Sequence, residues 1–326
     1  MKVLVLRFSS IGDIVLTSPI VRCLKQQVGE NCEVHFLTKQ GFKDLLTDNP
    51  YLTKLHTINK EIDEVIADLK AEQFDHVVDL HKNLRTKRLI AKLGIKNSSF
   101  PKLNIEKWLY TNFKVNKMPK LHIVDRYFEA VKELGVSNDA MGLDFFIGAD
   151  NEIDVKKHFG LGKYKAVAIG AQFATKRLPF EQLQHTLNAI EGNIVLLGGP
   201  TDKELGEELL KALPNKAITN LCGKLNLQQS ASVLKQSKAL LTHDTGLMHI
   251  ASAFKLPIIS VWGNTVPNFG MYAYMPGKQD LLSIHEVKGL KCRPCSKIGH
   301  QSCPKKHFKC MMNQDLEAIS KDVNSH

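Results

Sequence analysis

The sequence predicts an α/β protein with two Rossmann-like, parallel-sheet domains that face each other across a cleft. Short apolar runs alternate with segments of helical spacing, as in a parallel α/β sheet. This alternation restarts after residues 148–162, which places one domain at 1–150 and a second at 163–326. The length of 326 residues also suits two domains of ordinary size.

The first half contains four predicted strands, at 2–8, 33–38, 54–58 and 76–80. Helical spacing covers 14–27, 42–47, 61–72, 83–93 and 123–134. Pro19 falls in the first turn or two of the first of these helices, which favours a start after Asp13. Residues 96–120 are poorly patterned, and short helices and loops are expected there.

The second half continues the same order. Its predicted strands are 166–170, 194–197, 217–221, 238–242 and 257–262, and its predicted helices are 180–190, 202–213, 227–236 and 247–254. Because ligands of open α/β sheets bind beyond the carboxyl ends of the strands, the polar turns that follow these strands are the candidate site.

Several common functions are disfavoured by missing motifs. The chain has no P-loop, no Gly-x-Gly-x-x-Gly after the first strand, no Asp-x-Asp and no Gly-x-Ser-x-Gly. The apolar run at the N-terminus is too short for a signal peptide, and no run reaches the roughly 18–20 residues of a membrane span. A cytoplasmic protein is therefore expected.

The net charge of +11 is distributed unevenly. Residues 82–126 contain twelve Lys or Arg and two acids, and residues 288–309 contain seven and none. Such clusters attract phosphates, nucleic acid or an anionic membrane. A mildly basic, solvated surface is the simpler alternative.

Four polar turns remain as the candidate site: 9–13, 170–177, 197–200 and 243–249. Asp13 would be a general base in one domain. In the other, Lys176 and the amides of Thr245 and Gly246 would stabilise a developing diphosphate charge. The simpler interpretations are that Asp13, Asp244 or Thr245 only caps a helix and that Lys176 is a solvated loop residue.

Two of these stretches resemble the signatures of the glycosyltransferase family 9 heptosyltransferases. Residues 4–19, Leu-Val-Leu-Arg-Phe-Ser-Ser-Ile-Gly-Asp-Ile-Val-Leu-Thr-Ser-Pro, are similar to the N-terminal signature. Residues 244–249, Asp-Thr-Gly-Leu-Met-His, followed by 257–265, are similar to the C-terminal one. The resemblance extends over essentially the whole chain and implies a GT-B fold.

The resemblance also implies an inverting transfer of heptose from ADP-heptose to the inner core of lipopolysaccharide, with no cofactor required for catalysis. Asp13 matches the family's catalytic base. The residues that the resemblance assigns to donor binding are Thr175, Lys176, Gly199, Asp244, Thr245, Gly246 and His249. The acid expected to contact the donor ribose is not clearly matched, and Asp202 is the nearest candidate. By itself, a histidine at position 249 is more often structural than a ligand contact.

The acceptor that the resemblance implies is an anionic lipid A core, and the basic residues of the first half of the chain would attract it. The candidate acceptor contacts are His81, Asn83 and Arg85, although His81 could simply end a strand. The protein would then lie at the inner face of the cytoplasmic membrane as a peripheral protein.

Four cysteines near the C-terminus have spacing typical of a metal site. They are Cys292, Cys295, Cys303 and Cys310, with two histidines between them. A possible structural zinc, reduced thiols without metal, and disulfides are the alternatives, and reducing cytoplasm argues against disulfides.

Two other functions compete with this one. The same fold could use another nucleotide sugar or a non-lipid acceptor. A zinc-containing nucleic-acid-binding protein is disfavoured, because few aromatic residues lie among the positive charges and two nucleotide-type domains would remain unexplained. No nucleic-acid partner is therefore expected.

Overall fold

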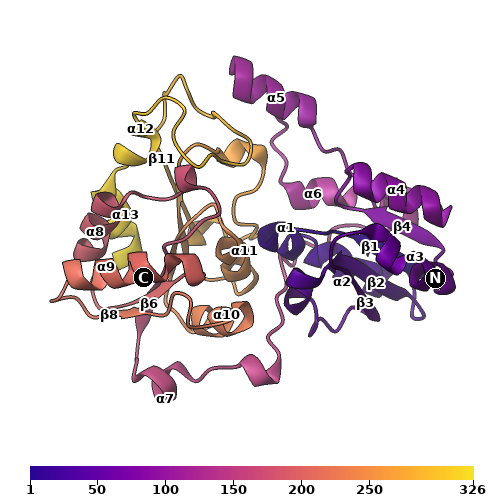
Figure 1. Cartoon of the computed structure of the whole chain (residues 1–326), viewed down its shortest axis with the longest axis horizontal. Helices are drawn as coiled ribbons and strands as arrows, with labels where there is room; N and C mark the ends of the chain where they lie inside the picture. Colours follow the sequence, from indigo (N-terminus) through magenta and orange to yellow (C-terminus); the bar gives the residue numbers. More distant parts are fainter. The chain divides into compact units, whose positions relative to one another are not determined.

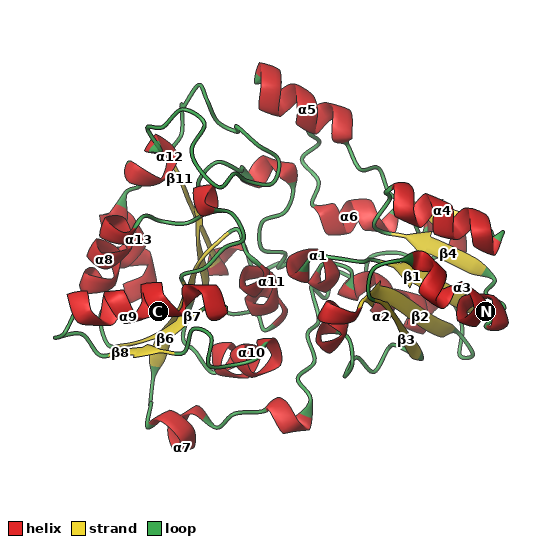
Figure 2. Ribbon diagram, in the orientation of Figure 1, coloured by secondary structure: helices red, strands yellow, loops and turns green.

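A computed structural model describes residues 1–326, which form two compact units (Figure 1). The N-terminal unit comprises Met1–Lys102 and Leu121–Gly148, and the C-terminal unit comprises Leu103–Lys120 and Ala149–His326. Both units are parallel α/β sheets with helices (Figure 2), so the predicted fold class of two Rossmann-like domains is confirmed. None of the helices has the length and apolar character needed to cross a membrane.

The N-terminal unit has a five-stranded parallel sheet in the order β3-β2-β1-β4-β5. The strands are β1 (Lys2–Leu6), β2 (Glu33–Lys39), β3 (Lys54–Ile58), β4 (His76–Asp79) and β5 (Asn97–Ser99). Residues 3–6 of β1 are all 0% exposed. Since successive residues of a strand point to opposite faces, the sheet is covered on both faces.

The helices of this unit follow the predicted positions but are shorter and more divided. They are α1 (Ile11–Val15), α2 (Ser18–Gln27), α3 (Ile66–Ala71), α4 (Leu84–Leu93) and α6 (Ile123–Phe128), with 3₁₀ turns at Gln40–Leu45, Ile62–Val65 and Lys132–Leu134. The predicted helix 14–27 is two helices, because Pro19 lies at the start of α2 and cannot continue the hydrogen bonding of α1.

The C-terminal unit has a six-stranded parallel sheet in the order β11-β10-β9-β6-β7-β8. The strands are β6 (Tyr164–Ala168), β7 (Asn193–Leu197), β8 (Ile218–Asn220), β9 (Leu240–His243), β10 (Ile258–Trp262) and β11 (Leu282–Glu286). Read from β8, chain order around the sheet is third, second, first, fourth, fifth, sixth, which is the Rossmann order. The order reverses between β6 and β9, as it does between β1 and β4 in the first sheet.

Four of the eight helices in the C-terminal unit match helices predicted individually from the sequence. The set is α5 (Asn104–Phe113), α7 (Val155–Phe159), α8 (Phe180–Ala189), α9 (Lys203–Ala212), α10 (Leu227–Lys235), α11 (Gly246–Ala253), α12 (Lys309–Met312) and α13 (Leu316–Asn324), with 3₁₀ turns at Ala149–Asn151, Ala174–Lys176, Pro200–Asp202, Pro267–Phe269 and Gln279–Leu281. The unpredicted α13 buries Ile319 and Val323 in the core of this unit. Strand β11 was also missed, because it is only half-buried and lacks a continuous apolar run.

Helix α5 changes the domain organisation that the sequence suggested. It lies in the poorly patterned region 96–120, which was assigned to the first domain. The ring of Tyr110 packs edge-on against Phe269 at 5.8 Å, and Nζ of Lys114 donates to the carbonyl of Pro294 at 2.7 Å. Residues 103–120 therefore group with the C-terminal unit, a non-local arrangement that hydrophobic periodicity does not encode.

Candidate active site

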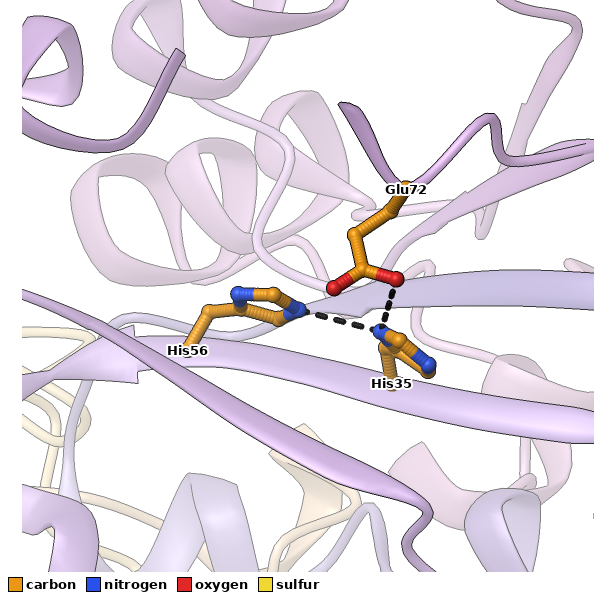
Figure 3. A group of neighbouring side chains, drawn as sticks. All are labelled: His35, His56 and Glu72. Carbon is orange, nitrogen blue, oxygen red and sulfur yellow. Dashed lines mark hydrogen bonds and ion pairs between the residues drawn. The ribbon is translucent and has the colours of Figure 1, made fainter. Parts of the chain in front are cut away.

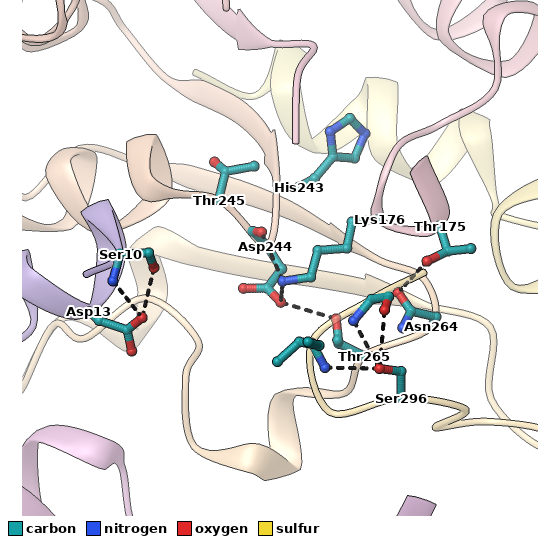
Figure 4. A network of polar contacts seen from close by, with 12 residues as sticks. Ser10, Asp13, Thr175, Lys176, His243, Asp244, Thr245, Asn264, Thr265 and Ser296 are labelled. Carbon is teal, nitrogen blue, oxygen red and sulfur yellow. Dashed lines mark hydrogen bonds and ion pairs between the residues drawn. The ribbon is translucent and has the colours of Figure 1, made fainter. Parts of the chain in front are cut away.

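The polar turn after β1 holds Asp13 in the first turn of α1 (Figure 4). The backbone N–H and the hydroxyl of Ser10 both donate to Asp13 Oδ2, at 3.2 and 2.7 Å. The other carboxylate oxygen lies 2.6 Å from Nη2 of Arg7. Asp13 therefore does help to start the helix, but its side chain is also 22% exposed and paired with a cation.

Arg7 is a buried cation that fixes the Asp13 carboxylate. Its Nη1 donates to the carbonyl of Leu80 and, at 3.2 Å, to the hydroxyl of Tyr127. Burial lowers the pKa of Arg7, the nearby Asp13 raises it, and the net result is a pKa above the ordinary value. Sequence reasoning missed this role, because Leu80 and Tyr127 lie 73 and 120 residues away along the chain.

An open pocket of about 500 Å³ lies at the carboxyl ends of β1, β2 and β4. Its lining residues are Phe8, Ser9, Lys39, His81, Asn83, Leu84 and Arg85. The three predicted acceptor contacts are thus brought together, and Lys39 is an additional cation that the sequence did not single out. The pocket includes the point where the strand order reverses, which is where ligands of such sheets bind.

Each predicted acceptor residue has a defined local role in this pocket. The ring of His81 lies 5.2 Å from that of Phe8, and burial, followed by the charge of Arg7, lowers the pKa of His81 to about 4. Its imidazole is therefore neutral near pH 7. The side-chain oxygen of Asn83 accepts from the amide of Thr86 at 2.9 Å and caps α4. Arg85, in the first turn of α4, adds positive charge to the lining.

In the C-terminal unit, Lys176 and Asp244 form an ion pair across the reversal point between β6 and β9. Lys176 Nζ lies 2.6 Å from Asp244 Oδ2, and each side chain is 15% exposed. The hydroxyl of Thr265, after β10, donates to the same oxygen at 3.1 Å. Figure 4 shows both side chains pointing at the carboxylate. Lys176 is therefore a positioned, largely covered cation and not a solvated loop residue.

The N-terminus of α11 begins beside this pair. Thr245 occupies the N-cap position in extended conformation, but its side chain makes no capping hydrogen bond. Its hydroxyl lies instead 3.0 Å from the hydroxyl of Thr242. The first amides of α11, starting at Gly246, thus have no side-chain cap, which favours an anion at this end of the helix. Asp244 does not cap the helix either, because its carboxylate faces Lys176.

Thr175 and His249 are placed below the surface. Thr175 is 2% exposed, and its Oγ1 accepts from the amide of His300 at 2.8 Å and lies 3.1 Å from Asn264 Oδ1. Its position connects the turn that carries Lys176 to the cysteine-rich segment. His249 is also 2% exposed, on the buried side of α11. Their predicted donor-binding role stays a prediction.

His243 also has a structural position. It is 2% exposed, and its Nε2 accepts from the backbone N–H of Leu178 at 3.0 Å. Burial lowers the pKa of His243 to about 4, so the ring is neutral near pH 7. This bond links the end of β9 to the turn that follows β6, and so fixes the spacing of Asp244 and Lys176.

The turn at Gly199 is occupied by a buried acid. The amide of Gly199 donates to Asp202 Oδ2 at 2.9 Å, and Arg177 Nη1 lies 3.3 Å from Asp202 Oδ1. A Cβ atom at Gly170 would lie 2.1 Å from the Asp202 carboxylate, and one at Gly198 would lie 2.8 Å from Asp202 Cβ. These glycines permit a close approach. Asp202 is only 6% exposed and its carboxylate faces these internal partners, so its contact with a donor ribose stays a prediction.

Two site elements were not assigned a role from the sequence. Thr265, in the polar turn after β10, could have been found by the rule that such turns face the site. Arg293 could not have been found in this way, because it lies in the loop of the cysteine-rich segment. Its Nη2 donates to the carbonyl of Thr265 at 2.9 Å, and its Nη1 pairs with Glu286 at 2.7 Å. Arg293 holds the Thr265 turn in place.

The four C-terminal cysteines are neighbours with free thiols. Three are half-buried and Cys310 is buried. Burial raises the pKa of the Cys310 thiol to about 12, with contributions from the other three thiols. Cys292 Sγ lies 3.8 Å from His307 Nε2. The donor types suit a thiolate–imidazole metal site, but no three of these sulfur and imidazole atoms lie within 4.8 Å of one another. The group whose ligand atoms do lie that close is His35, His56 and Glu72.

That second group is a structural network (Figure 3). His35 Nδ1 lies 3.0 Å from His56 Nε2 and 3.9 Å from Glu72 Oε2. The Glu72 oxygens, however, already pair with Lys2 at 3.1 Å and Lys54 at 2.5 Å. A divalent ion would have to compete with two ammonium groups for this carboxylate. The network also lies toward the amino ends of the strands, away from the pocket.

Comparisons with known proteins agree with this geometry. A model of glycosyltransferase family 9 (heptosyltransferase) matches residues 62–300. Lipooligosaccharide heptosyltransferase 2 of Haemophilus influenzae is 25% identical, over 93% of this chain and 94% of the relative.

Solved structures share the fold. A glycosyltransferase family 9 protein from Veillonella parvula superposes with a TM-score of 0.79 and 21% identity, covering 99% of this chain and 96% of that one. The ADP-heptose lipopolysaccharide heptosyltransferase II of Escherichia coli has a TM-score of 0.72 and 19% identity, covering 100% and 98%. The GT-B type of the two-domain fold is therefore confirmed.

Proposed function

Because this chain belongs to glycosyltransferase family 9 (heptosyltransferase), we propose that it transfers a heptose from ADP-heptose to the lipid-anchored inner core of lipopolysaccharide. The named relatives, which match nearly the full length, support this donor and acceptor. The observation that carries the proposal is the pairing of a positioned lysine, Lys176, with the uncapped N-terminus of α11 at the strand-order reversal of the C-terminal sheet.

That arrangement suits a diphosphate. The ammonium of Lys176 and the first amides of α11 supply positive charge where the ADP leaving group gains negative charge. Asp244 carries the same sign as the diphosphate, so it would act by holding Lys176 and by accepting hydrogen bonds from sugar hydroxyls. No metal is needed for this charge stabilisation.

Asp13 is proposed as the general base. It would take the proton from the acceptor hydroxyl as that oxygen bonds to the anomeric carbon of the heptose. The bond from the anomeric carbon to the phosphate oxygen breaks, ADP leaves with the electron pair, and the configuration inverts. Arg7 and Ser10 fix the carboxylate for this step, so that no reorganisation is needed when the proton moves.

The pocket of the N-terminal unit is proposed as the acceptor site. Lys39 and Arg85 line it, and the exposed basic residues of α4, Lys87 and Arg88, extend the positive charge beyond it. A phosphorylated inner core is anionic and would be attracted there. Because this acceptor is lipid-linked, contact with the inner face of the cytoplasmic membrane is part of the proposal.

The cysteine cluster is proposed to hold a structural metal ion through Cys292, Cys295, Cys303 and Cys310. Sulfur donors favour zinc or iron, and the ion would fix the segment that His300 connects to Thr175. Metal analysis of the purified protein should give close to one equivalent of either metal. Less than about half an equivalent, in protein purified under reducing conditions without chelators, would reject the site.

Donor screening tests the main proposal. The protein is incubated with ADP-heptose or with UDP- and GDP-sugars on a lipid A core acceptor, and nucleoside diphosphate release is measured. ADP release from ADP-heptose alone is the expected result. Release only from a UDP- or GDP-sugar would replace the donor and keep the reaction class, and no release from any donor would reject the transfer itself.

A further inference from the structure

Helix α5 and the residues after it form an exposed surface that the transfer reaction does not use. No residue of α5 is buried. Four large apolar side chains in this stretch face solvent: Ile105 (72% exposed), Trp108 (54%), Phe113 (61%) and Val115 (43%). We name residues 102–120 the α5 segment. A surface of this kind, with several large apolar groups on one short element, marks an interaction site.

The opposite side of the segment is attached to the C-terminal unit. Tyr110 contacts Phe269, and Lys114 Nζ donates to the Pro294 carbonyl. Trp108 and Phe113 pack edge to face at 5.1 Å, and both remain exposed. The helix is therefore held in place on one side while its apolar side chains are presented on another.

The charge of the segment identifies the partner. It carries five lysines and one acid, at Lys102, Lys107, Lys114, Lys117, Lys120 and Glu106. Lys107 lies on α5 beside Trp108, and the exposed Lys117 and Lys120 follow the helix, so that lysines border the apolar groups as in an interfacial helix. Such a helix inserts its apolar groups at the level of the lipid headgroups while its lysines reach anionic phosphates.

We propose that the α5 segment docks the protein on an anionic lipid bilayer. This inference rests on the proposed lipid-linked acceptor, because an enzyme that modifies a membrane-anchored sugar gains from being held at the same surface. A protein partner is less well matched, since the lysine-rich border favours phosphates over a mixed protein surface.

The two tryptophans of the chain provide a direct assay. Trp108 is 54% exposed, whereas Trp262 is 1% exposed in the core, so a change in the environment of an exposed tryptophan reports on α5. The full-length protein is titrated with vesicles of equal parts phosphatidylglycerol and phosphatidylcholine, and with vesicles of phosphatidylcholine alone. The expected result is a blue shift and quenching by brominated lipid with the anionic vesicles only, both weakened by salt.

Variants separate docking from catalysis. The double variant Ile105→Ser/Phe113→Ser should lower partitioning into anionic vesicles by on the order of 100-fold, because each change removes a large apolar side chain from the interface and weakens partitioning about 10-fold. Met141→Ser, at an exposed methionine of the N-terminal unit, is the matched control and should partition like the unchanged protein. Circular dichroism checks that each variant is folded.

Transfer is measured in the same variants on two acceptors. With a core oligosaccharide freed of its acyl chains, Ile105→Ser/Phe113→Ser should act at the unchanged rate, and with the acceptor embedded in vesicles it should be slower. Unchanged vesicle binding by this variant, or no spectral change at Trp108, would overturn the docking proposal while leaving the transfer reaction in place. Normal docking with no transfer on either acceptor would instead reject the proposed function.

Discussion

Lys176 offers the sharpest test of the donor half-site. Its side chain is 15% exposed and its ammonium lies 2.6 Å from Asp244 Oδ2, so it is positioned before any ligand binds. Lys176→Met removes one positive charge of a diphosphate site and leaves the Asp244 carboxylate without its cation. Two unit charges about 4 Å apart interact by about 4 kcal/mol at an effective dielectric constant of 20. Part of this attraction is offset because Lys176 must give up some of its pairing with Asp244.

A net loss of about 2–3 kcal/mol is therefore expected, equivalent to about 30- to 150-fold in the dissociation constant of ADP. Titration calorimetry with ADP measures this directly, and kcat/KM for ADP-heptose should fall at least as far. The double variant Lys176→Met/Asp244→Asn removes the unpaired acid too and should bind ADP more tightly than the single variant, by roughly tenfold.

The control is Lys235→Met, an exposed lysine of α10 whose partner is the surface acid Glu152. It should bind ADP like the unchanged protein. If Lys176→Met also binds ADP within twofold of the unchanged protein, Lys176 is not a diphosphate ligand. If the double variant binds no better than the single one, the uncompensated charge of Asp244 is not the reason for the loss.

The remaining predictions concern catalysis and stability. Asp13→Asn should lower kcat by about 10²- to 10⁴-fold and leave ADP affinity nearly unchanged by calorimetry; a large loss of ADP affinity would contradict its role as base. Burial lowers the pKa of His56 to about 4 in the folded protein. Between about pH 6.5 and 4 this histidine therefore binds a proton in the unfolded chain but not in the folded protein. Stability should thus fall as pH drops from about 6.5 to 4, by up to about 3 kcal/mol for this group, and urea unfolding of His56→Gln should show a shallower fall. Gly198→Ala should destabilise the protein by about 1–3 kcal/mol, because its Cβ would meet Asp202 at 2.8 Å, whereas Gly41→Ala, with nothing within 4 Å, should melt like the unchanged protein.

Much of the fold follows from local pattern. The apolar runs gave nine of the strands within a few residues, because buried parallel strands are apolar on both faces and need no partner to be recognised. Strands β5 and β11 were missed for the converse reason: β5 has only three residues, and neither strand is fully buried. Helix α13 was also missed, although it buries Ile319 and Val323. The assignment of α5 depended on contacts with Phe269 and Pro294, more than 150 residues away.

The candidate site divides in the same way. Its chemistry was visible in the sequence, because Asp13 follows a predicted strand of the N-terminal sheet, and Lys176 and Asp244 follow predicted strands of the C-terminal sheet, whose carboxyl ends share one edge. The order of the strands was not visible, and it is this order that brings Lys176 to Asp244 across 68 residues.

Tertiary structure alone decided which polar residues face a ligand and which support them. Thr175 and His249 are each 2% exposed, so their donor-binding role stays a prediction, and side-chain burial reveals Arg7 as the buried partner of Asp13. Residue type and spacing are local properties that fix what chemistry is possible in a turn. Burial and charge pairing depend on chain segments brought together by folding, and they determine which of those groups is held ready to act.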